Sequence, residues 1–200
     1  MIGFIFECGP QGADKQVCEY LAAHICPQNK FTSKTLDNKP NLLRDAGKVA
    51  AQMLKDKCVA VLIVWDLRPA WPGDTPKPCR KKERTQLLQV LDDAGVAQKA
   101  PVYLVCIEQE LESWLLASDH AISAVLSTDT RPYEVNRVRH PDRVNSPKSE
   151  MMKHFDTARG WRYEDRNDAA RTLRAADIDL KRLRRSVSFA RFEEKLLLHK

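Results

Sequence analysis

The sequence predicts an α/β fold, with an open, mostly parallel sheet of four strands, helices on both faces of the sheet and a helical appendage at the C-terminus. Short apolar runs alternate four times with segments of helical periodicity along the first 117 residues, an order typical of parallel sheets. The clearest run, residues 59–65 (VAVLIVW), is apolar without interruption, as expected of a strand covered on both faces. Beyond about residue 127, only helical patterns remain.

The first half of the sheet region contains two strands and two helices. Residues 2–6 (IGFIF) form a compact apolar run, and the loop CGPQG leads from it into a helix expected over residues 13–25. A proline shortly after that segment ends the helix. Residues 31–36 alternate weakly, which indicates a strand, and residues 41–55 carry apolar side chains at helical spacing, which indicates a second helix.

The second half of the sheet region repeats this order. The buried strand over residues 59–65 is followed by a proline-rich loop and by a helix expected over residues 82–94. Residues 102–107 (VYLVCI) form the fourth apolar run, and residues 108–117 are expected to form the next helix. The alternation of strands and helices along the chain predicts the class of the fold. It does not predict which strands are neighbours in the sheet.

The last third of the chain has a different amino-acid composition. Residues 128–149 are polar, punctuated by prolines and rich in arginine, which predicts a long loop. Helices are expected over residues 151–158, 167–176 and 188–198. We therefore expect two regions: an α/β core over residues 1–127, and a basic loop and helical region over residues 128–200 that packs on the core.

The composition is that of a globular domain of ordinary size. A chain of 200 residues with 43% hydrophobic and 30% charged residues can bury a core without disulfides. No apolar run approaches the roughly 20 residues that a membrane span needs, and the start MIGFIFECG lacks the basic region of a signal peptide. The six scattered cysteines then favour reduced thiols. These observations predict a cytoplasmic protein without membrane association.

Positive charge gathers near the C-terminus. The formal net charge is +6, which favours a polyanionic partner such as nucleic acid without establishing one. The last twenty residues contain seven lysines and arginines against two glutamates. Arg182, Arg184 and Arg185 are the candidates for contacts with nucleic acid, and an ordinary solvated helix face is the alternative explanation of the same charges.

Carboxylates follow three of the four predicted strands. Glu7 and Asp66 come directly after the first and third strands, and Glu108 after the fourth, with Glu112 one helical turn further on. In open α/β sheets, ligands bind beyond the carboxyl ends of the strands, and Mg²⁺ prefers oxygen ligands. Single acids at strand ends are commonly solvated or cap the next helix. Glu7 and Asp66 together favour a site for Mg²⁺ or Mn²⁺.

The chain resembles the TOPRIM fold of topoisomerases, primases and the overcoming-lysogenization-defect nucleases in having a glutamate after the first strand and an aspartate after the third. The segment IEQELESWLLA (residues 107–117) resembles the E-x-W-L-L-A helix of a bacterial family of unknown function assigned to the TOPRIM group. Pro147-Lys148, the Tyr163 region and SFARF (residues 188–192) resemble the C-terminal half of that family. The resemblance thus spans nearly the whole chain.

The resemblance implies a function. It implies a TOPRIM-like, metal-dependent nuclease that acts on DNA or RNA as an effector of phage defence, with an ATPase as partner protein. Glu7 and Asp66 would be catalytic metal ligands, and Lys148 would neutralise a phosphate in the transition state. Glu108 and Glu112 are candidates for a further metal ligand.

One departure from the TOPRIM pattern affects these expectations. TOPRIM enzymes usually carry Asp-x-Asp after the third strand, whereas this chain has Asp66-Leu67-Arg68. Asp74 in the proline-rich loop is one replacement for the second aspartate, and Glu108 or Glu112 are better ones because they follow a strand. Alternatively, Arg68 itself holds a phosphate through its guanidinium group.

Two other functional classes compete with the nuclease. A degenerate, non-catalytic TOPRIM module that binds nucleic acid or the ATPase would also explain the departure at Arg68. An unrelated small-molecule enzyme on a doubly wound sheet is the third reading. No glycine-rich loop of the Walker type is present, which argues against ATP hydrolysis by this chain itself.

Overall fold

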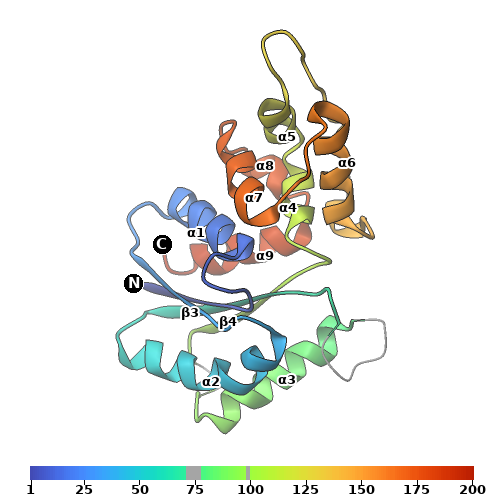
Figure 1. Cartoon of the computed structure of the whole chain (residues 1–200). Coiled ribbons are helices and arrows are strands. Elements are labelled where there is room, and N and C mark those ends of the chain that lie inside the picture. The colour runs from blue at the N-terminus through green and yellow to red at the C-terminus, as the bar shows by residue number, and fades with distance from the viewer. Residues whose placement is uncertain (71–77, 98–99) are drawn as a thin grey trace. The chain divides into compact units, whose positions relative to one another are not determined.

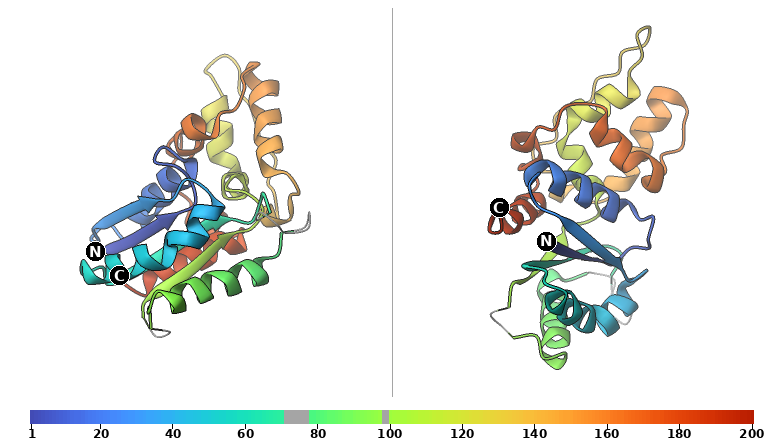
Figure 2. Two further views of the ribbon diagram at one scale, coloured as in Figure 1. Left: turned by 60° about the horizontal axis from the view of Figure 1, so that its bottom comes forward. Right: turned by 90° about the vertical axis from the view of Figure 1, so that its left-hand side faces the viewer.

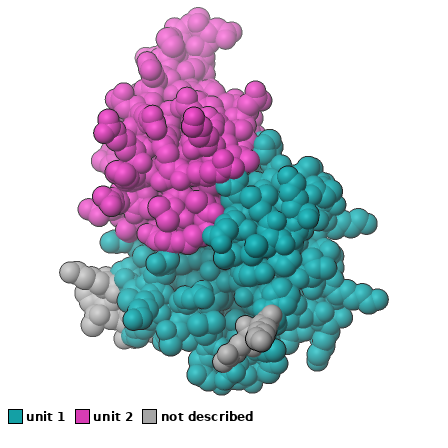
Figure 3. Space-filling view, turned by 180° about the vertical axis from the view of Figure 1, so that it is seen from behind, with its two compact units in different colours: residues 1–107, 192–200 teal, residues 108–191 magenta. Residues whose placement is uncertain are grey.

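The computed structural model describes residues 1–70, 78–97 and 100–200, which form two compact units (Figures 1 and 3). The first unit comprises residues 1–107 and 192–200, and the second comprises residues 108–191. The change of composition near residue 127 thus lies inside the second unit. Within the described residues, no helix has both the length and the apolar character needed to cross a membrane.

The first unit is built on a sheet of four parallel strands. These strands are β1 (Ile2–Phe6), β2 (Phe31–Thr35), β3 (Ala60–Asp66) and β4 (Val102–Ile107), in the order β2-β1-β3-β4. The predicted α/β class with an open, parallel four-stranded sheet is confirmed. Because β1 and β3 are the two inner strands, their carboxyl ends lie side by side in the middle of the sheet edge.

Helices cover both faces of this sheet. They are α1 (Ala13–Ile25), α2 (Lys39–Lys55) and α3 (Arg80–Asp93). Figures 1 and 2 show α2 and α3 on one face and α1 on the other. The two helices on the shared face approach closely at Gly47, where an added Cβ would lie 2.2 Å from the carbonyl oxygen of Val90.

Apolar side chains from strands and helices fill the space between these layers. On the face covered by α2 and α3, Ile5, Ile63 and Trp65 pack with Leu42 and Leu87, all of them buried. On the other face, the ring of Phe4 stacks on Phe192, with centroids 6.1 Å apart. Phe192 belongs to α9 (Val187–Leu197), whose second half is part of the first unit. Helix packing on both faces explains why β1 and β3 are apolar along their length.

The second unit is helical. It contains α4 (Glu112–Ala117), α5 (Asp119–Leu126), a short 3₁₀ helix η1 (Pro141–Arg143), α6 (Pro147–Arg159), α7 (Asp165–Arg174), α8 (Leu180–Leu183) and the first half of α9. The sequence predicted α4, α6, α7 and α9 but not α5 or α8. The helix expected to begin at Glu108 begins four residues later, because Gln109 adopts the left-handed conformation, with a φ of 68°.

Two of the segments that carry the family resemblance, residues 107–117 and 188–192, are joined by a buried network. Trp114 is fully buried, as expected of a core residue, and its indole N–H donates to the hydroxyl of Ser188 over 2.8 Å. The carboxylate of Asp142 accepts from the hydroxyl of Ser186 over 2.7 Å and from the backbone N–H of Ser188 over 2.9 Å. Buried polar groups need such partners. The tryptophan and serine motifs therefore have a structural role in the second unit.

Candidate functional site

Glu7 and Asp66 lie at the carboxyl ends of neighbouring strands. In the parallel pairing of β1 with β3, Phe6 is opposite Val64, and the backbone N–H of Glu7 continues the ladder by donating to the carbonyl of Val64 over 3.2 Å. Asp66 is the last residue of β3. The backbone N–H of Asp66 also interacts with the carboxylate of Glu7. The sheet register thus places the two acids that the sequence pointed to at the adjacent ends of two neighbouring strands.

Burial dominates the electrostatics of Glu7. It raises the pKa of this carboxyl to about 8, and the carboxylates of Asp14 and Glu83 raise it further, while the Lys39 ammonium and the Asp66 N–H act in the opposite direction. Among the described residues, Oε2 of Glu7 is buried and has no hydrogen-bond partner. A carboxylate oxygen in this state is costly unless it gains a proton or a cation.

A lysine that the sequence analysis did not single out belongs to the same sheet edge. Lys39 is the first residue of α2, four residues after the last residue of β2, and is only 4% exposed. Its ammonium donates to the carbonyl of Leu67 over 3.1 Å and also to the carbonyl of Pro69. The ammonium is therefore fixed between backbone oxygens just beyond Asp66 and contributes a positive charge near Glu7.

A second buried acid also escaped the sequence analysis. Glu83 in α3 is fully buried and accepts a hydrogen bond from the indole N–H of Trp65 over 2.7 Å. Its charge acts on the pKa of Glu7 and of the Cys106 thiol. In the sequence, Glu83 lies within a strongly charged helix segment, KKER, which is typical of a solvated face. Only the tertiary structure shows that it faces the sheet.

The other predicted ligands have partners within the second unit. Glu108 accepts from the Arg191 guanidinium over 2.7 Å, and Glu112 accepts from the hydroxyl of Tyr163 over 3.1 Å. Glu108 precedes α4, so Glu108 and Glu112 do not share a helix face as the spacing suggested. Asp74 lies outside the described residues. Within the described part of the chain, no three His, Cys, Asp or Glu side chains are grouped so that they could hold a metal ion.

Glu112 and Lys148 form a polar cluster of their own. Burial raises the pKa of Glu112 to about 7, and the Lys148 ammonium and the Tyr163 hydroxyl act against this shift. Lys148 itself forms an ion pair with Asp165 over 2.6 Å, and its backbone N–H donates to the Glu110 carboxylate over 3.2 Å. The structure thus groups these residues around α4 and the start of α6.

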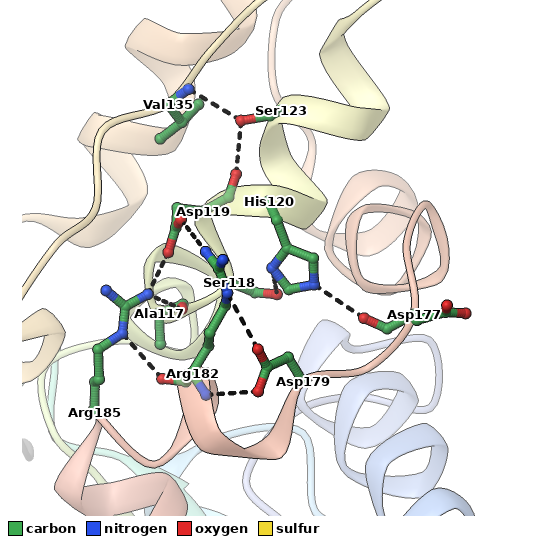
Figure 4. A network of polar contacts seen from close by, with 10 residues as sticks. All are labelled: Ala117, Ser118, Asp119, His120, Ser123, Val135, Asp177, Asp179, Arg182 and Arg185. Atoms are coloured by element: carbon green, nitrogen blue, oxygen red, sulfur yellow. Dashed lines mark hydrogen bonds and ion pairs between the residues drawn. The ribbon is translucent and has the colours of Figure 1, made fainter.

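The four arginines proposed to contact nucleic acid differ in their surroundings. Arg68 and Arg184 are exposed. Arg182 forms ion pairs with Asp119 over 2.5 Å and with Asp179 over 3.1 Å (Figure 4). The side chain of Arg185 is only 9% exposed and is also paired with Asp119. Arg182 and Arg185 therefore contribute to the internal structure of the second unit.

Comparison with known proteins places the chain in a family. The model of the family described as "Domain of unknown function (DUF4276)" matches residues 11–197, and the chain belongs to this family. No curated protein and no solved structure matches the chain.

Proposed function

We propose that this protein is a metal-dependent nuclease with a TOPRIM-like site at Glu7 and Asp66, and that Mg²⁺ or Mn²⁺ is its cofactor. One observation carries the proposal: two carboxylates stand at the adjacent carboxyl ends of β1 and β3, and one oxygen of Glu7 is buried without a hydrogen-bond partner among the described residues. Open parallel sheets bind their ligands at this edge.

The residues present fit a hard divalent cation. Mg²⁺ is commonly held by one or two carboxylates, with waters and substrate phosphates completing its coordination. Glu7 and Asp66 supply two carboxylates. Because burial disfavours the ionised form of Glu7, a bound cation would stabilise its negative charge. When bound, the cation would polarise a phosphodiester and lower the pKa of a water molecule.

The neighbouring basic residues have distinct roles in this proposal. The Lys39 ammonium, fixed by the carbonyls of Leu67 and Pro69, offsets negative charge where a phosphate approaches. Arg68, exposed in the loop after β3, binds a phosphate of the substrate through its planar guanidinium. Because Arg68 occupies the place of the second aspartate of the TOPRIM pattern, we propose a site with one metal ion instead of two.

The sequence also pointed to Glu108 and Glu112 as further metal ligands and to Lys148 as a contact to phosphate. These three residues belong to the second unit, and the proposed site does not include them. Each of them would have to exchange a present partner: Arg191, Tyr163 and Asp165, respectively. For this reason, Glu7 and Asp66 carry the proposal and the other three residues do not.

The biological setting is proposed from the sequence motifs. Residues 107–117 and 188–192 resemble a family assigned to the TOPRIM group. The family whose model matches residues 11–197 does not conflict with that resemblance. We extend the proposal to an effector of phage defence in the cytoplasm, acting on DNA or RNA together with an ATPase partner.

The second candidate function is a non-catalytic module that binds nucleic acid or the ATPase. The guanidinium of Arg68, exposed directly after β3, favours it, because a positive charge at this place suits a phosphate better than a second metal ion. This candidate predicts nucleic-acid binding without cleavage.

A cleavage assay separates the two candidates. The wild-type chain is incubated with single-stranded and duplex DNA and RNA in Mg²⁺, in Mn²⁺ or in EDTA. We expect cleavage that requires the metal and that falls by about 100-fold or more in Asp66→Asn, because the amide removes a charged ligand without changing the shape of the side chain.

Asp93→Asn is the matched control, because Asp93 is an exposed residue at the end of α3 in the same unit. It should cleave like the wild type. Binding of nucleic acid without metal-dependent cleavage would favour the non-catalytic module. Cleavage that survives in Asp66→Asn would contradict the assigned site.

A further inference from the structure

A basic cavity lies in the second unit, apart from the acids of the sheet edge. Its volume is about 250 Å³, and five charged residues line it: Arg137, Asp179, Lys181, Arg182 and Arg185. The walls thus carry four positive side chains and one negative one. Arg137 comes from the polar segment after α5, and the others come from α8 and its flanks. A concave surface with this excess of positive charge attracts anions.

Two of the cationic side chains that line the cavity, Arg182 and Arg185, are held in position by ion pairs with Asp119. Figure 4 shows the carboxylate of Asp119 between the guanidinium groups of Arg182 and Arg185. Asp119 is only 7% exposed, and Arg185 also donates to the carbonyl of Ala117 over 2.5 Å. Side chains that are already ordered lose little conformational freedom when a ligand binds. The network therefore resembles a prearranged site more than a set of mobile surface charges.

One donor of this network has no acceptor among the described residues. Nη1 of Arg185 is buried and has no hydrogen-bond partner among the described residues, although Nε and Nη2 of the same guanidinium are both engaged. A buried donor without a partner is rare in native proteins and often marks a place for an ion or a water molecule. Phosphate oxygens are the acceptors that arginine guanidinium groups bind most strongly, together with carboxylates.

The positive charge of the cavity is only partly neutralised. Asp119 and Asp179 offset two of the four cations. Arg137 and Lys181 are exposed, and neither side chain has an ion-pair partner in the described part of the chain. These two residues are therefore available to a ligand, whereas Arg182 and Arg185 form the fixed wall.

The size of the cavity limits what can enter it. Sites for complete small molecules typically measure about 300–1,000 Å³, which is more than this cavity offers. A single phosphate group fits this limit better than a complete nucleotide does. We propose that the cavity binds one backbone phosphate of a nucleic acid, through Arg137 and Lys181 at its mouth and through the guanidinium groups of Arg182 and Arg185 at its wall.

The choice of nucleic acid over free phosphate rests on the proposed function, whereas phosphate binding as such does not. The test therefore measures binding in EDTA, where no cleavage occurs. The double variant Arg137→Gln/Lys181→Gln removes the two exposed cations and leaves the pairs with Asp119 intact. Its control is Arg131→Gln/Arg143→Gln, which removes two exposed charges of the same unit that do not line the cavity.

Fluorescence anisotropy with labelled duplex DNA is recorded for all three proteins over a series of salt concentrations. The cavity variant should lose one phosphate contact. The log–log slope of its affinity against salt should therefore be smaller by about 0.9 than that of the wild type, and its binding at low salt should be weaker by about tenfold. The control should keep the slope of the wild type. Inorganic phosphate should compete with DNA for the wild type but not for the cavity variant.

Two outcomes would overturn the inference. If the cavity variant and the control have the same affinity and the same salt slope, the cavity binds no backbone phosphate. The melting temperature of the wild type and of the cavity variant is also measured with inorganic phosphate. If phosphate raises the melting temperature of the wild type but not that of the cavity variant, while both proteins bind DNA equally, the cavity takes free phosphate and the assignment to nucleic acid is wrong. Neither outcome depends on whether the protein cleaves its substrate.

Discussion

Glu7→Gln is expected to stabilise the metal-free protein by about 3 kcal/mol at pH 7 and to leave its stability unchanged below about pH 4. Burial raises the pKa of Glu7 from 4.5 to about 8 in the folded state. Between these two pH values, the folded protein retains a proton that the unfolded chain releases. Rising pH therefore favours unfolding over this window, and glutamine, which cannot ionise, removes the effect.

The measurement is urea unfolding of both proteins at several pH values in EDTA. Glu194→Gln is the control, because Glu194 is an exposed carboxylate in the part of α9 that belongs to the same unit. It should follow the wild type at every pH. An equal dependence of stability on pH in wild type and Glu7→Gln would show that Glu7 is not buried as a neutral acid.

Asp119→Ala is expected to destabilise the second unit by about 3–5 kcal/mol. The substitution removes the carboxylate that pairs with both Arg182 and Arg185. Because the Arg185 side chain is only 9% exposed, its guanidinium would remain buried without a counter-charge. Removing one partner of a buried ion pair lowers the free energy of unfolding by more than losing an exposed pair does.

Asp179→Ala is the matched comparison. Asp179 also pairs with Arg182, over 3.1 Å, but its side chain is 41% exposed, and it accepts from the backbone N–H of Arg182 as the N-cap of α8. Losing this cap and an exposed ion pair should cost about 1 kcal/mol. Urea unfolding of the two variants gives the comparison. A cost for Asp119→Ala that is no larger than that for Asp179→Ala would contradict the structural role of Asp119.

The strands were predictable because their signal is local. A run such as AVLIVW, bounded by charged residues, is a buried strand in almost any context, and β3 occupies residues 60–66 where 59–65 were expected. The strand ends then placed Glu7 and Asp66 at one edge of the sheet without knowledge of the strand order. Their side-by-side position followed only once β1 and β3 were seen to be neighbours.

The remaining parts of the two sites depend on contacts that are distant in sequence. Lys39 is held by carbonyls 28 and 30 residues away, and Arg185 by a carboxylate 66 residues away. Such charged residues resemble solvated ones in the sequence. The start of α4 was placed too early for another reason: glutamine does not mark the left-handed conformation that Gln109 adopts, as glycine or asparagine would.

Direct titration of Mn²⁺ tests the central claim, that Glu7 and Asp66 together hold a divalent cation. Isothermal titration calorimetry of the wild type, Glu7→Gln, Asp66→Asn and the control Asp93→Asn gives the affinity and the number of sites. We predict one site per chain in the wild type and in Asp93→Asn, and loss of that site in both Glu7→Gln and Asp66→Asn. Equal Mn²⁺ binding by all four proteins, or by none of them, would contradict the account.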